Sequence, residues 1–313
     1  MIVTVTPNPS IDRTVFVDTI RQREVNRVLA TETDAGGKGV NVARVAKEMG
    51  ANVVATGFLA GSPGQFVRNV LDREGVRHQF VEIPGETRVN IFVEQRLGSG
   101  PPTSFNEEGP EVASEAWQSL LSKVRELAAG AGWATLGGSV PPGLNEESYV
   151  EVLEAMRAAG CKVVIDADST VLRRSVKFCP DLVKPNASEA QSLLGERMST
   201  LREALKGAQM LHDSGIGIAI VSRGAAGAAL ACSEGLFHGF PPRVEANSTI
   251  GSGDSMIGAM LWALEAGKST VEAFAWGIAA GAATATTSGS EIARKPMVDE
   301  LIRQVRVEKH AAP

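Results

Sequence analysis

The sequence predicts an α/β fold in which a doubly wound, mainly parallel sheet is covered by helices and carries a small β-sheet lid. Two observations point to this class. Segments of strand length alternate along the chain with segments of helical periodicity, and each expected strand ends in polar residues and Gly or Pro. Ligands of such sheets bind outside the carboxyl ends of the strands, so we expect the functional residues there.

The first half of the chain supplies its elements in a regular order. Residues 2–6 alternate apolar and polar side chains as a strand does, and Val42, Val45 and Met49 then recur at helical spacing before a stop at Gly50. Further along we expect a strand at 53–58, helices at about 65–74 and 112–129, and a strand at 134–136.

The second half continues the alternation and places a polar residue directly after each strand. After a helix that ends at Gly160, we expect strands at 163–165, 182–183 and 218–221. Asp166, Lys184 and Ser222 respectively follow these strands. Their side chains are therefore expected at one edge of the sheet.

Two stretches, residues 11–33 and 87–106, interrupt this rhythm, because both have strand patterns with intervening turns and few helix signals. If they pair with each other, they form a β subdomain that acts as a lid over the strand ends. The expected division is therefore an α/β domain of residues 1–10, 34–86 and 107–313, and a lid of residues 11–33 and 87–106.

Composition excludes several classes of function. The 31 Lys and Arg residues against 36 Asp and Glu give a net charge of −5, which argues against nucleic-acid or anionic-membrane partners. The apolar run at 273–287 is shorter than the ~20 residues of a membrane-spanning helix. The amino terminus resembles a strand rather than an export signal, so we expect a cytoplasmic protein. Three cysteines without CxxC spacing and four scattered histidines favour neither disulfides nor a Cys/His metal site.

The segment Thr249–Ser255, of sequence TIGSGDS, is the most informative one, because its glycines directly precede an apolar helix. Backbone N–H groups at such a helix start, together with the helix dipole, favour a bound anion. The segment lacks the Gly-Lys-Ser/Thr ending of a Walker loop, and Met256 stands where a GxGxxG motif needs its third glycine. The alternative interpretation is that Ser252 or Asp254 only caps the helix.

Asp254 also has a definite chemical use in this place. It is positioned to accept a hydroxyl proton while the N–H groups stabilise charge on a transferred phosphoryl group. The helix N-terminus is expected to keep the carboxylate ionised and therefore a weak base, which suits the loose transition state of phosphoryl transfer.

A second glycine-rich turn, Ala35–Ala43, also leads into a helix. Its three glycines, Lys38 and Asn41 suit a phosphorylated or polyhydroxylated ligand, although a flexible turn with a solvated lysine is the simpler reading. Asn8 and Asp12 follow the first strand. At a strand end Asp12 is suited to bind sugar hydroxyls, but both residues are also ordinary turn residues, and taken alone they favour a turn.

Two further strand ends carry polar residues. In the segment 183–190, Asn186 and Glu189 have the spacing of a helix cap, and the same pair is suited to steer a hydrated Mg²⁺ near nucleotide phosphates. In the turn 137–143, Pro141 stands where a hydrolase elbow requires glycine, so Ser139 is not a good candidate for a nucleophile.

Taken together in this order, these motifs resemble the phosphosugar branch of the ribokinase-like, or PfkB, kinase superfamily. The resemblance runs nearly end to end and rests on the motifs TPNPSID, AGGKGVNVAR, GETR, GGSVPPG, IDADS, VKPNASE, SRGAAGA and STIGSGDSMIGAM. The last motif is the most specific, with Ser252 where the family signature G-A-G-D has alanine. The IDADST segment and Arg223 also depart from the usual family pattern, and both lie on the nucleotide side.

The resemblance implies a role for each matching position. Asp254 is similar to the catalytic base, and Gly251, Ser252 and Gly253 form the anion-binding turn. The positions similar to sugar-phosphate-binding residues are Asp12, Gly36, Gly37, Lys38, Asn41, Arg88 and Ser139. The positions similar to ATP-binding residues are Lys184, Asn186, Ser222, Gly224 and Gly227, and Glu189 matches the glutamate that organises Mg²⁺.

The resemblance also implies partners and a reaction. In related kinases the lid mediates dimer formation and contributes an arginine across the interface, so we expect a homodimer in which Arg27 takes this part. The implied reaction is transfer from ATP, with Mg²⁺, to a phosphorylated ketohexose, most simply D-fructose 1-phosphate to the 1,6-bisphosphate. A 6-phosphofructokinase and a tagatose-6-phosphate kinase stay open, since Lys38 does not say which carbon carries the phosphate. A non-catalytic sugar-phosphate sensor is the alternative outside the enzyme class.

Overall fold

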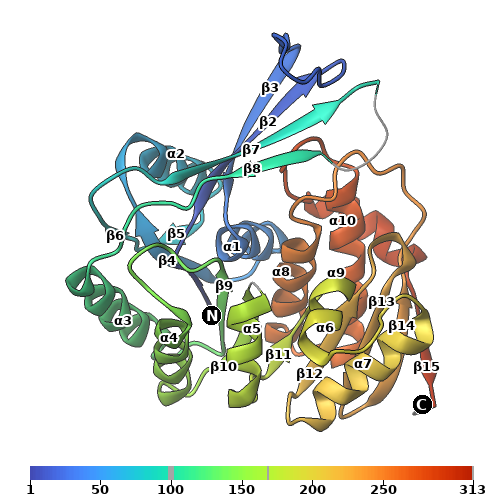
Figure 1. Ribbon diagram of the computed structural model, residues 1–313. Helices are drawn as coiled ribbons and strands as arrows, with labels where there is room; N and C mark the ends of the chain where they lie inside the picture. The colour runs from blue at the N-terminus through green and yellow to red at the C-terminus, as the bar shows by residue number, and fades with distance from the viewer. Residues whose placement is uncertain (98–101, 168, 312–313) are drawn as a thin grey trace.

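The computed structural model describes residues 1–97, 102–167 and 169–311, and its main element is a large mixed sheet (Figure 1). The sheet order is β15-β14-β13-β12-β11-β10-β9-β1-β4-β5, with β6 paired to β4. These strands are β1 Ile2–Thr6, β4 Val53–Leu59, β5 Arg77–His78, β6 Val81–Glu82, β9 Trp133–Gly138, β10 Lys162–Ala167, β11 Leu182–Val183, β12 Ile218–Ser222, β13 Ala228–Cys232, β14 Gly235–Phe240 and β15 Arg306–His310.

The predicted fold class is confirmed. The pairs from β5 through β12 are parallel, with Val5 of β1 opposite Leu136 of β9 and Thr56 of β4. The strands from β12 to β15 pair in antiparallel fashion and form one edge of the sheet. Strands β13, β14 and β15 were not predicted from the sequence, because short hairpin strands lack the strand–helix alternation that identifies the parallel part.

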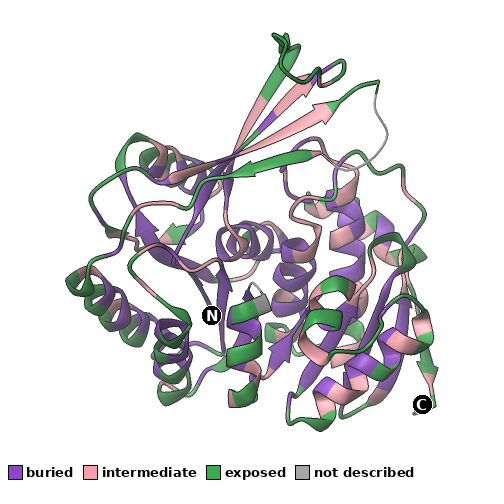
Figure 2. Cartoon of the chain, viewed as in Figure 1, coloured by how far each residue is buried: buried purple, intermediate pink, exposed green. Residues whose placement is uncertain are grey.

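Helices cover both faces of the main sheet, as expected for a doubly wound fold. One face is packed by α3 Ser114–Ala128, α4 Glu146–Ala158, α5 Ser169–Ser175, α6 Ala187–Leu194 and α7 Leu201–Asp213. The other is packed by α1 Lys38–Met49, α2 Gly61–Arg73, α8 Ser252–Glu265 and α9 Thr270–Ala285, with α10 Lys295–Leu301 against α9. Successive strand residues point to opposite faces, so Val163 and Ile165 lie in one cluster and Val164 in the other. The sheet interior is accordingly buried (Figure 2).

The predicted helices are present, and one begins earlier than expected. Helix α2 begins at Gly61 rather than near Gln65, because Pro63 is tolerated in a first helical turn, where its missing N–H has no partner to lose. No helix in the described part of the chain is long and apolar enough to cross a membrane.

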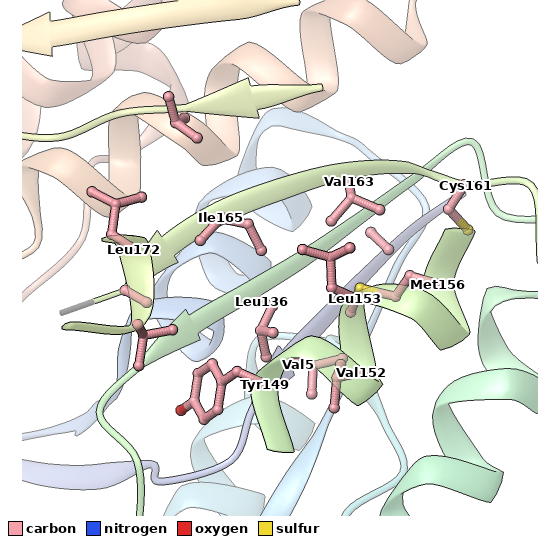
Figure 3. Close-up of a cluster of buried hydrophobic side chains, with 14 of the residues drawn as sticks. Val5, Leu136, Tyr149, Val152, Leu153, Met156, Cys161, Val163, Ile165 and Leu172 are labelled. Carbon is pink, nitrogen blue, oxygen red and sulfur yellow. The ribbon is translucent and has the colours of Figure 1, made fainter. Parts of the chain in front are cut away.

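Helix α4 connects the core to the strand ends. Its Tyr149 is fully buried and packs with Leu136, Val5 and Leu153 between helix and sheet (Figure 3). The Tyr149 hydroxyl donates a 2.7 Å hydrogen bond to the carbonyl of Ser139 in the turn after β9. A hydrophobic side chain with a polar end thus fixes the position of a turn at the edge of the sheet.

A second, smaller sheet projects from the main body (Figure 1). Its strands are β2 Ser10–Val17, β3 Ala30–Gly36, β7 Arg88–Gln95 and β8 Thr103–Asn106, in the order β3-β2-β7-β8. Strand β2 is parallel to β7, with Asp12 opposite Asn90, so the two sequence stretches that we expected to form a lid are hydrogen-bonded to each other. The sequence Gly98–Pro102 predicts a turn in this sheet, and most of this turn lies outside the described residues, as does Asp168 of the IDADS motif.

Candidate active site

Helix α8 begins with an uncapped glycine turn. Its N-cap is Gly251, whose φ of +73° lies in the left-handed region that glycine adopts without strain, and no side chain caps this end within the described chain. Ser252 and Asp254 therefore do not act as the cap, so that alternative is wrong. First-turn N–H groups without a side-chain cap stabilise a nearby anion.

Asp254 lies in the first turn of α8 and is only 9% exposed. Its Oδ2 accepts a 2.8 Å hydrogen bond from Nδ2 of Asn41 in α1. Burial, and next the carboxylate of Asp166, raise the pKa of Asp254 to about 6, against the opposing effects of Lys38, Asn41 and Lys184. The carboxylate is thus a stronger base than an exposed aspartate, because burial and Asp166 outweigh the groups that favour its charged form.

The close approach of α1 to α8 depends on Gly258. A Cβ at this position would lie 2.9 Å from the Val42 carbonyl oxygen and 2.9 Å from the Val45 side chain, both on α1. Any side chain here would separate the two helices. Gly258 thereby keeps Asn41 within reach of Asp254.

Two lysines share one buried carboxylate at the end of β10. Lys38 Nζ lies 2.9 Å from Asp166 Oδ1, and Lys184 Nζ lies 3.4 Å from Asp166 Oδ2. Burial alone would raise the pKa of Asp166, but Lys184 and Lys38 outweigh it and lower that pKa. Burial alone would lower the pKa of Lys38, but Asp166, Asp254 and Glu189 outweigh it and raise that pKa. Lys38 therefore remains a cation.

Asp12 lies on β2 of the small sheet and is buried. Its Oδ1 accepts hydrogen bonds from Ser10 Oγ at 2.8 Å and from Asn90 Nδ2 at 2.9 Å. Burial raises the pKa of Asp12, against the effect of these two donors. A Cβ at Gly36 would lie 2.4 Å from the Asp12 carboxyl carbon, so only glycine fits beside this carboxylate.

Asn8, which follows β1, forms hydrogen bonds with two other predicted site residues, Arg88 and Ser139. Its carbonyl oxygen accepts hydrogen bonds from Nε and Nη2 of Arg88 at 3.2 and 3.1 Å, and its side-chain Nδ2 is 3.2 Å from Ser139 Oγ. Arg88 at the start of β7 and Ser139 after β9 are thus linked through one residue. Gly37, with a φ of +106°, precedes Lys38 as the N-cap of α1 and turns the chain from β3 into that helix.

Asn186 and Glu189 form a reciprocal capping box at the start of α6. Asn186 Oδ1 accepts from the Glu189 N–H at 2.9 Å, and Glu189 Oε2 accepts from the Asn186 N–H at 2.8 Å. The capping interpretation is therefore confirmed. The other oxygen, Oε1, lies 4.0 Å from Lys38 Nζ, so this glutamate also faces the lysine pair.

A cavity of about 390 Å³ lies beside this cap. Asn186, Ser222 and Gly224 are among the residues that line it, and Asn186 pairs with Ser222 in an isolated parallel bridge. Gly227, with a φ of +84°, closes the adjoining turn. The predicted nucleotide-side positions are thus neighbours in space, although they come from two separate segments of the chain.

Arg27 is separate from these residues. It lies in the exposed connection between β2 and β3, at the outer end of the small sheet (Figure 1). Within one chain the structure does not bring it to the other predicted positions.

Comparison with known proteins identifies this arrangement. The model of the "pfkB family carbohydrate kinase" family matches residues 5–296. This chain belongs to that family. A curated 1-phosphofructokinase from Borreliella burgdorferi is 32% identical over 309 residues, which cover 98% of each chain. Two structures of phosphofructokinase-2 from Escherichia coli are each 29% identical, over 97% of this chain and 98% of theirs. The complex with fructose-6-phosphate has a TM-score of 0.88, and the tetrameric inhibited form has one of 0.87.

This pfkB-family protein is therefore a carbohydrate kinase, a phosphotransferase with an alcohol acceptor that uses ATP. The reaction type agrees with the geometry at α8, where a buried carboxylate lies in the first turn of a helix with an uncapped N-terminus. Phosphoryl transfer depends mainly on positioning and on neutralisation of charge, and the site places two lysines close to that carboxylate.

The sequence predicted no role for two residues at this candidate site. Asp166 was recognised only as the residue that follows a strand, although its position in the IDADS motif was a usable signal. Asn90 lies in β7 of the small sheet with no motif around it, and only its pairing opposite Asp12 shows its connection to the candidate site.

Proposed function

We propose that this pfkB-family kinase transfers the γ-phosphoryl group of MgATP to the 6-hydroxyl of D-fructose 1-phosphate. The observation that carries the proposal is the position of Asp254, buried in the first turn of α8 and bonded to Asn41, a few residues along α1 from Lys38. A base, an anion-binding turn and a substrate-side cation thus belong to two adjacent helix starts.

In the proposed step, Asp254 accepts the proton of the attacking hydroxyl. The new bond joins the sugar oxygen to the γ-phosphorus, the bond from the γ-phosphorus to the β,γ-bridging oxygen breaks, and ADP leaves. Backbone N–H groups of the Gly251–Gly253 turn stabilise the charge on the transferred group. Lys184, whose Nζ lies 2.8 Å from where a Gly253 Cβ would be, neutralises charge on the nucleotide phosphates beside the same turn.

The substrate's own phosphate is assigned to Lys38 and Arg88. Arg88 is held by the Asn8 carbonyl, and Lys38 is held by Asp166, so both cations are oriented before substrate arrives. Asp12, Asn41 and Ser139 supply acceptors and donors for sugar hydroxyls, with Gly36 and Gly37 giving the backbone room to approach.

Glu189 is the residue proposed to organise Mg²⁺. Within the described part of the chain, no group of three or more His, Cys, Asp or Glu side chains could hold a metal ion. Mg²⁺ in kinase sites is commonly held by one or two carboxylates with substrate phosphates and water, and Glu189 keeps Oε1 outside its capping box for such a contact. When bound with ATP, Mg²⁺ neutralises phosphate charge.

A homodimer through the small sheet is the proposed assembly. Val25, Val28, Leu29, Leu97 and Phe105 are large apolar side chains exposed on this sheet or its connections, with Val25 90% exposed. Clustered exposed apolar residues mark association surfaces. In this dimer Arg27 reaches the substrate phosphate of the partner subunit, which gives the exposed arginine a role that it lacks within one chain.

A 6-phosphofructokinase is the second candidate, supported by the likeness to the phosphofructokinase-2 complex with fructose-6-phosphate. An assay of ADP release from MgATP distinguishes 1-phosphofructokinase, 6-phosphofructokinase and tagatose-6-phosphate kinase activities. It compares kcat/KM for fructose 1-phosphate, fructose 6-phosphate and tagatose 6-phosphate. We expect fructose 1-phosphate to be preferred, and Asp254→Asn as control to lose the activity. A preference for fructose 6-phosphate would favour the second candidate, and failure with all three in a protein that binds ATP would favour a sensor.

A further inference from the structure

The turn between β12 and β13 borders the cavity assigned to the nucleotide. It is closed by internal hydrogen bonds, from Arg223 N to Gly227 O at 2.8 Å and from Gly227 N to Gly224 O at 3.0 Å. Arg223 and Gly224 line the cavity of about 390 Å³. On one side the turn is fastened by Arg223 Nη2, which donates to the Ser199 carbonyl at 3.1 Å.

On its other side the turn meets the imidazole of His238. This residue lies in β14, is only 3% exposed, and has its Nε2 3.1 Å from the Ala226 carbonyl oxygen. A carbonyl oxygen can only accept, so Nε2 carries the proton and donates. Nδ1 is then unprotonated in the neutral ring, and within the described structure it is buried without a hydrogen-bond partner.

The packing beside His238 leaves no room for a side chain at Gly227, the last residue of the turn. A Cβ at Gly227 would lie 2.1 Å from the Gly239 carbonyl oxygen and 3.0 Å from His238 Nε2. The turn therefore lies directly against β14, and the bond from His238 to Ala226 crosses that contact. The same strand thus sets the position of the cavity wall.

We propose that His238 is a positioning residue for ATP, which holds the Arg223–Gly227 turn at the distance from β14 that the bound nucleotide requires. The proposal rests on the assignment of the 390 Å³ cavity to the nucleotide. His238 acts through the Ala226 carbonyl and has no role at the reacting atoms.

The surroundings of the ring favour its neutral, donating form. Burial first, and then the charges of His310 and Arg223, lower the pKa of His238, whereas Ala226 and Glu308 oppose that shift. The rings of His310 and Phe240 lie at centroid distances of 6.3 and 4.0 Å. Protonation would create a buried Nδ1–H donor without an acceptor, which is costly.

Two substitutions test the bond. His238→Phe keeps a ring of similar size and removes the donor, while His238→Gln keeps an N–H donor of similar reach. For His238→Phe we expect KM for MgATP to rise about fivefold, the effect of one lost neutral hydrogen bond, with kcat and the sugar-phosphate KM unchanged within about twofold. His238→Gln is expected to remain close to the parent protein. Equal changes in both KM values, or equal defects in Phe and Gln variants, would overturn the proposal.

A third variant distinguishes failure of this inference from failure of the nucleotide assignment. Ser199→Trp places a large side chain in the wall of the cavity. If it leaves KM for MgATP unchanged, the assignment of the cavity is wrong. If it raises that KM while His238→Phe does not, only the role of His238 is wrong.

A measurement on the unaltered protein covers the case in which His238→Phe does not fold. Nitrogen-15 NMR of the imidazole is expected to show a proton on Nε2 and none on Nδ1, and saturation with a non-hydrolysable ATP analogue is expected to shift the Nε2 signal. A ring protonated on Nδ1, or an Nε2 signal that does not respond to the nucleotide analogue, would contradict the proposal.

Discussion

Asn41 and Asp254 are 213 residues apart in the sequence, and their side chains meet in a hydrogen bond of 2.8 Å. Each lies in the first turns of a helix that begins after a glycine-rich turn, α1 after Gly37 and α8 after Gly251. The bond therefore joins the substrate-side helix start to the helix start that carries the proposed base.

Replacement of Asp254 by Asn removes the proposed base and keeps the shape of the side chain. We expect kcat to fall on the order of 10³-fold, because a positioned general base contributes roughly 10² to 10⁴. The KM for the sugar phosphate is expected to stay within a few-fold. Steady-state kinetics measures both, with Asp213→Asn on the exposed end of α7 as the matched control. Near-normal turnover of the Asp254 variant would refute the assignment.

The pKa of Asp254 near 6 sets the acid limb of the pH profile. We expect kcat/KM to rise with pH through about 6 and then to level off, since the ionised carboxylate is the base. Asn41→Ala is expected to move this midpoint upward, because the Asn41 bond lowers the pKa of Asp254, whereas Asp166→Asn is expected to move it downward by removing a neighbouring negative charge. A midpoint that neither variant moves would show that another group limits the rate.

The same pKa has a consequence for stability. The folded state raises the pKa of Asp254 from 3.8 to about 6, so folded protein binds this proton more tightly than unfolded protein does. The contribution of Asp254 to stability is therefore greatest below about pH 4 and is lost as the pH rises to about 6. Denaturant unfolding measures the free energy of unfolding of the parent protein and of Asp254→Asn between pH 4 and 7. We expect the variant to become more stable relative to the parent protein as the pH rises over this range. A difference in unfolding free energy that does not change with pH would contradict this.

Substitutions of Arg88 and Lys38 are expected to change the KM for the sugar phosphate more than the KM for ATP. Arg88→Ala removes a charge-assisted contact to phosphate and is expected to raise the sugar-phosphate KM about 30-fold, with little change in KM for ATP. Lys38→Ala is expected to affect the sugar phosphate more than ATP, and Lys184→Ala to show the reverse. Lys38 also contacts Asp166 and Glu189. Equal effects of Lys38→Ala on both KM values would contradict its assignment to the sugar phosphate.

The proposed dimer is testable at the apolar residues of the small sheet. Val28→Asp or Leu97→Asp places a charge where the partner subunit would bury it, so we expect monomers in sedimentation and light scattering. Met297→Asp is the matched control, because Met297 is an exposed apolar residue of α10 outside that sheet. Arg27→Ala is expected to raise the sugar-phosphate KM in a protein that remains dimeric. A parent protein that is monomeric would exclude the assembly.

The sequence by itself determined the fold class and the positions of the motifs. Period-2 and period-3.6 patterns identified β1, α1 and β4 within a few residues, because one buried face dictates the spacing of apolar side chains. Glycines at 37 and 251 marked the two helix starts, since a left-handed or otherwise positive φ is readily adopted only by glycine. The series of motifs, in their order along the chain, indicated the family.

Only the tertiary structure decided how those motifs act on one another. Asp166 lies between Lys38 and Lys184, and this arrangement arises from strands and helices that are distant in the sequence. The direction in which the pKa of Asp254 moves likewise depends on burial and on Asp166, neither of which a local motif contains. Desolvation and Coulomb energy depend on distances between side chains, and those distances exist only once the chain has folded.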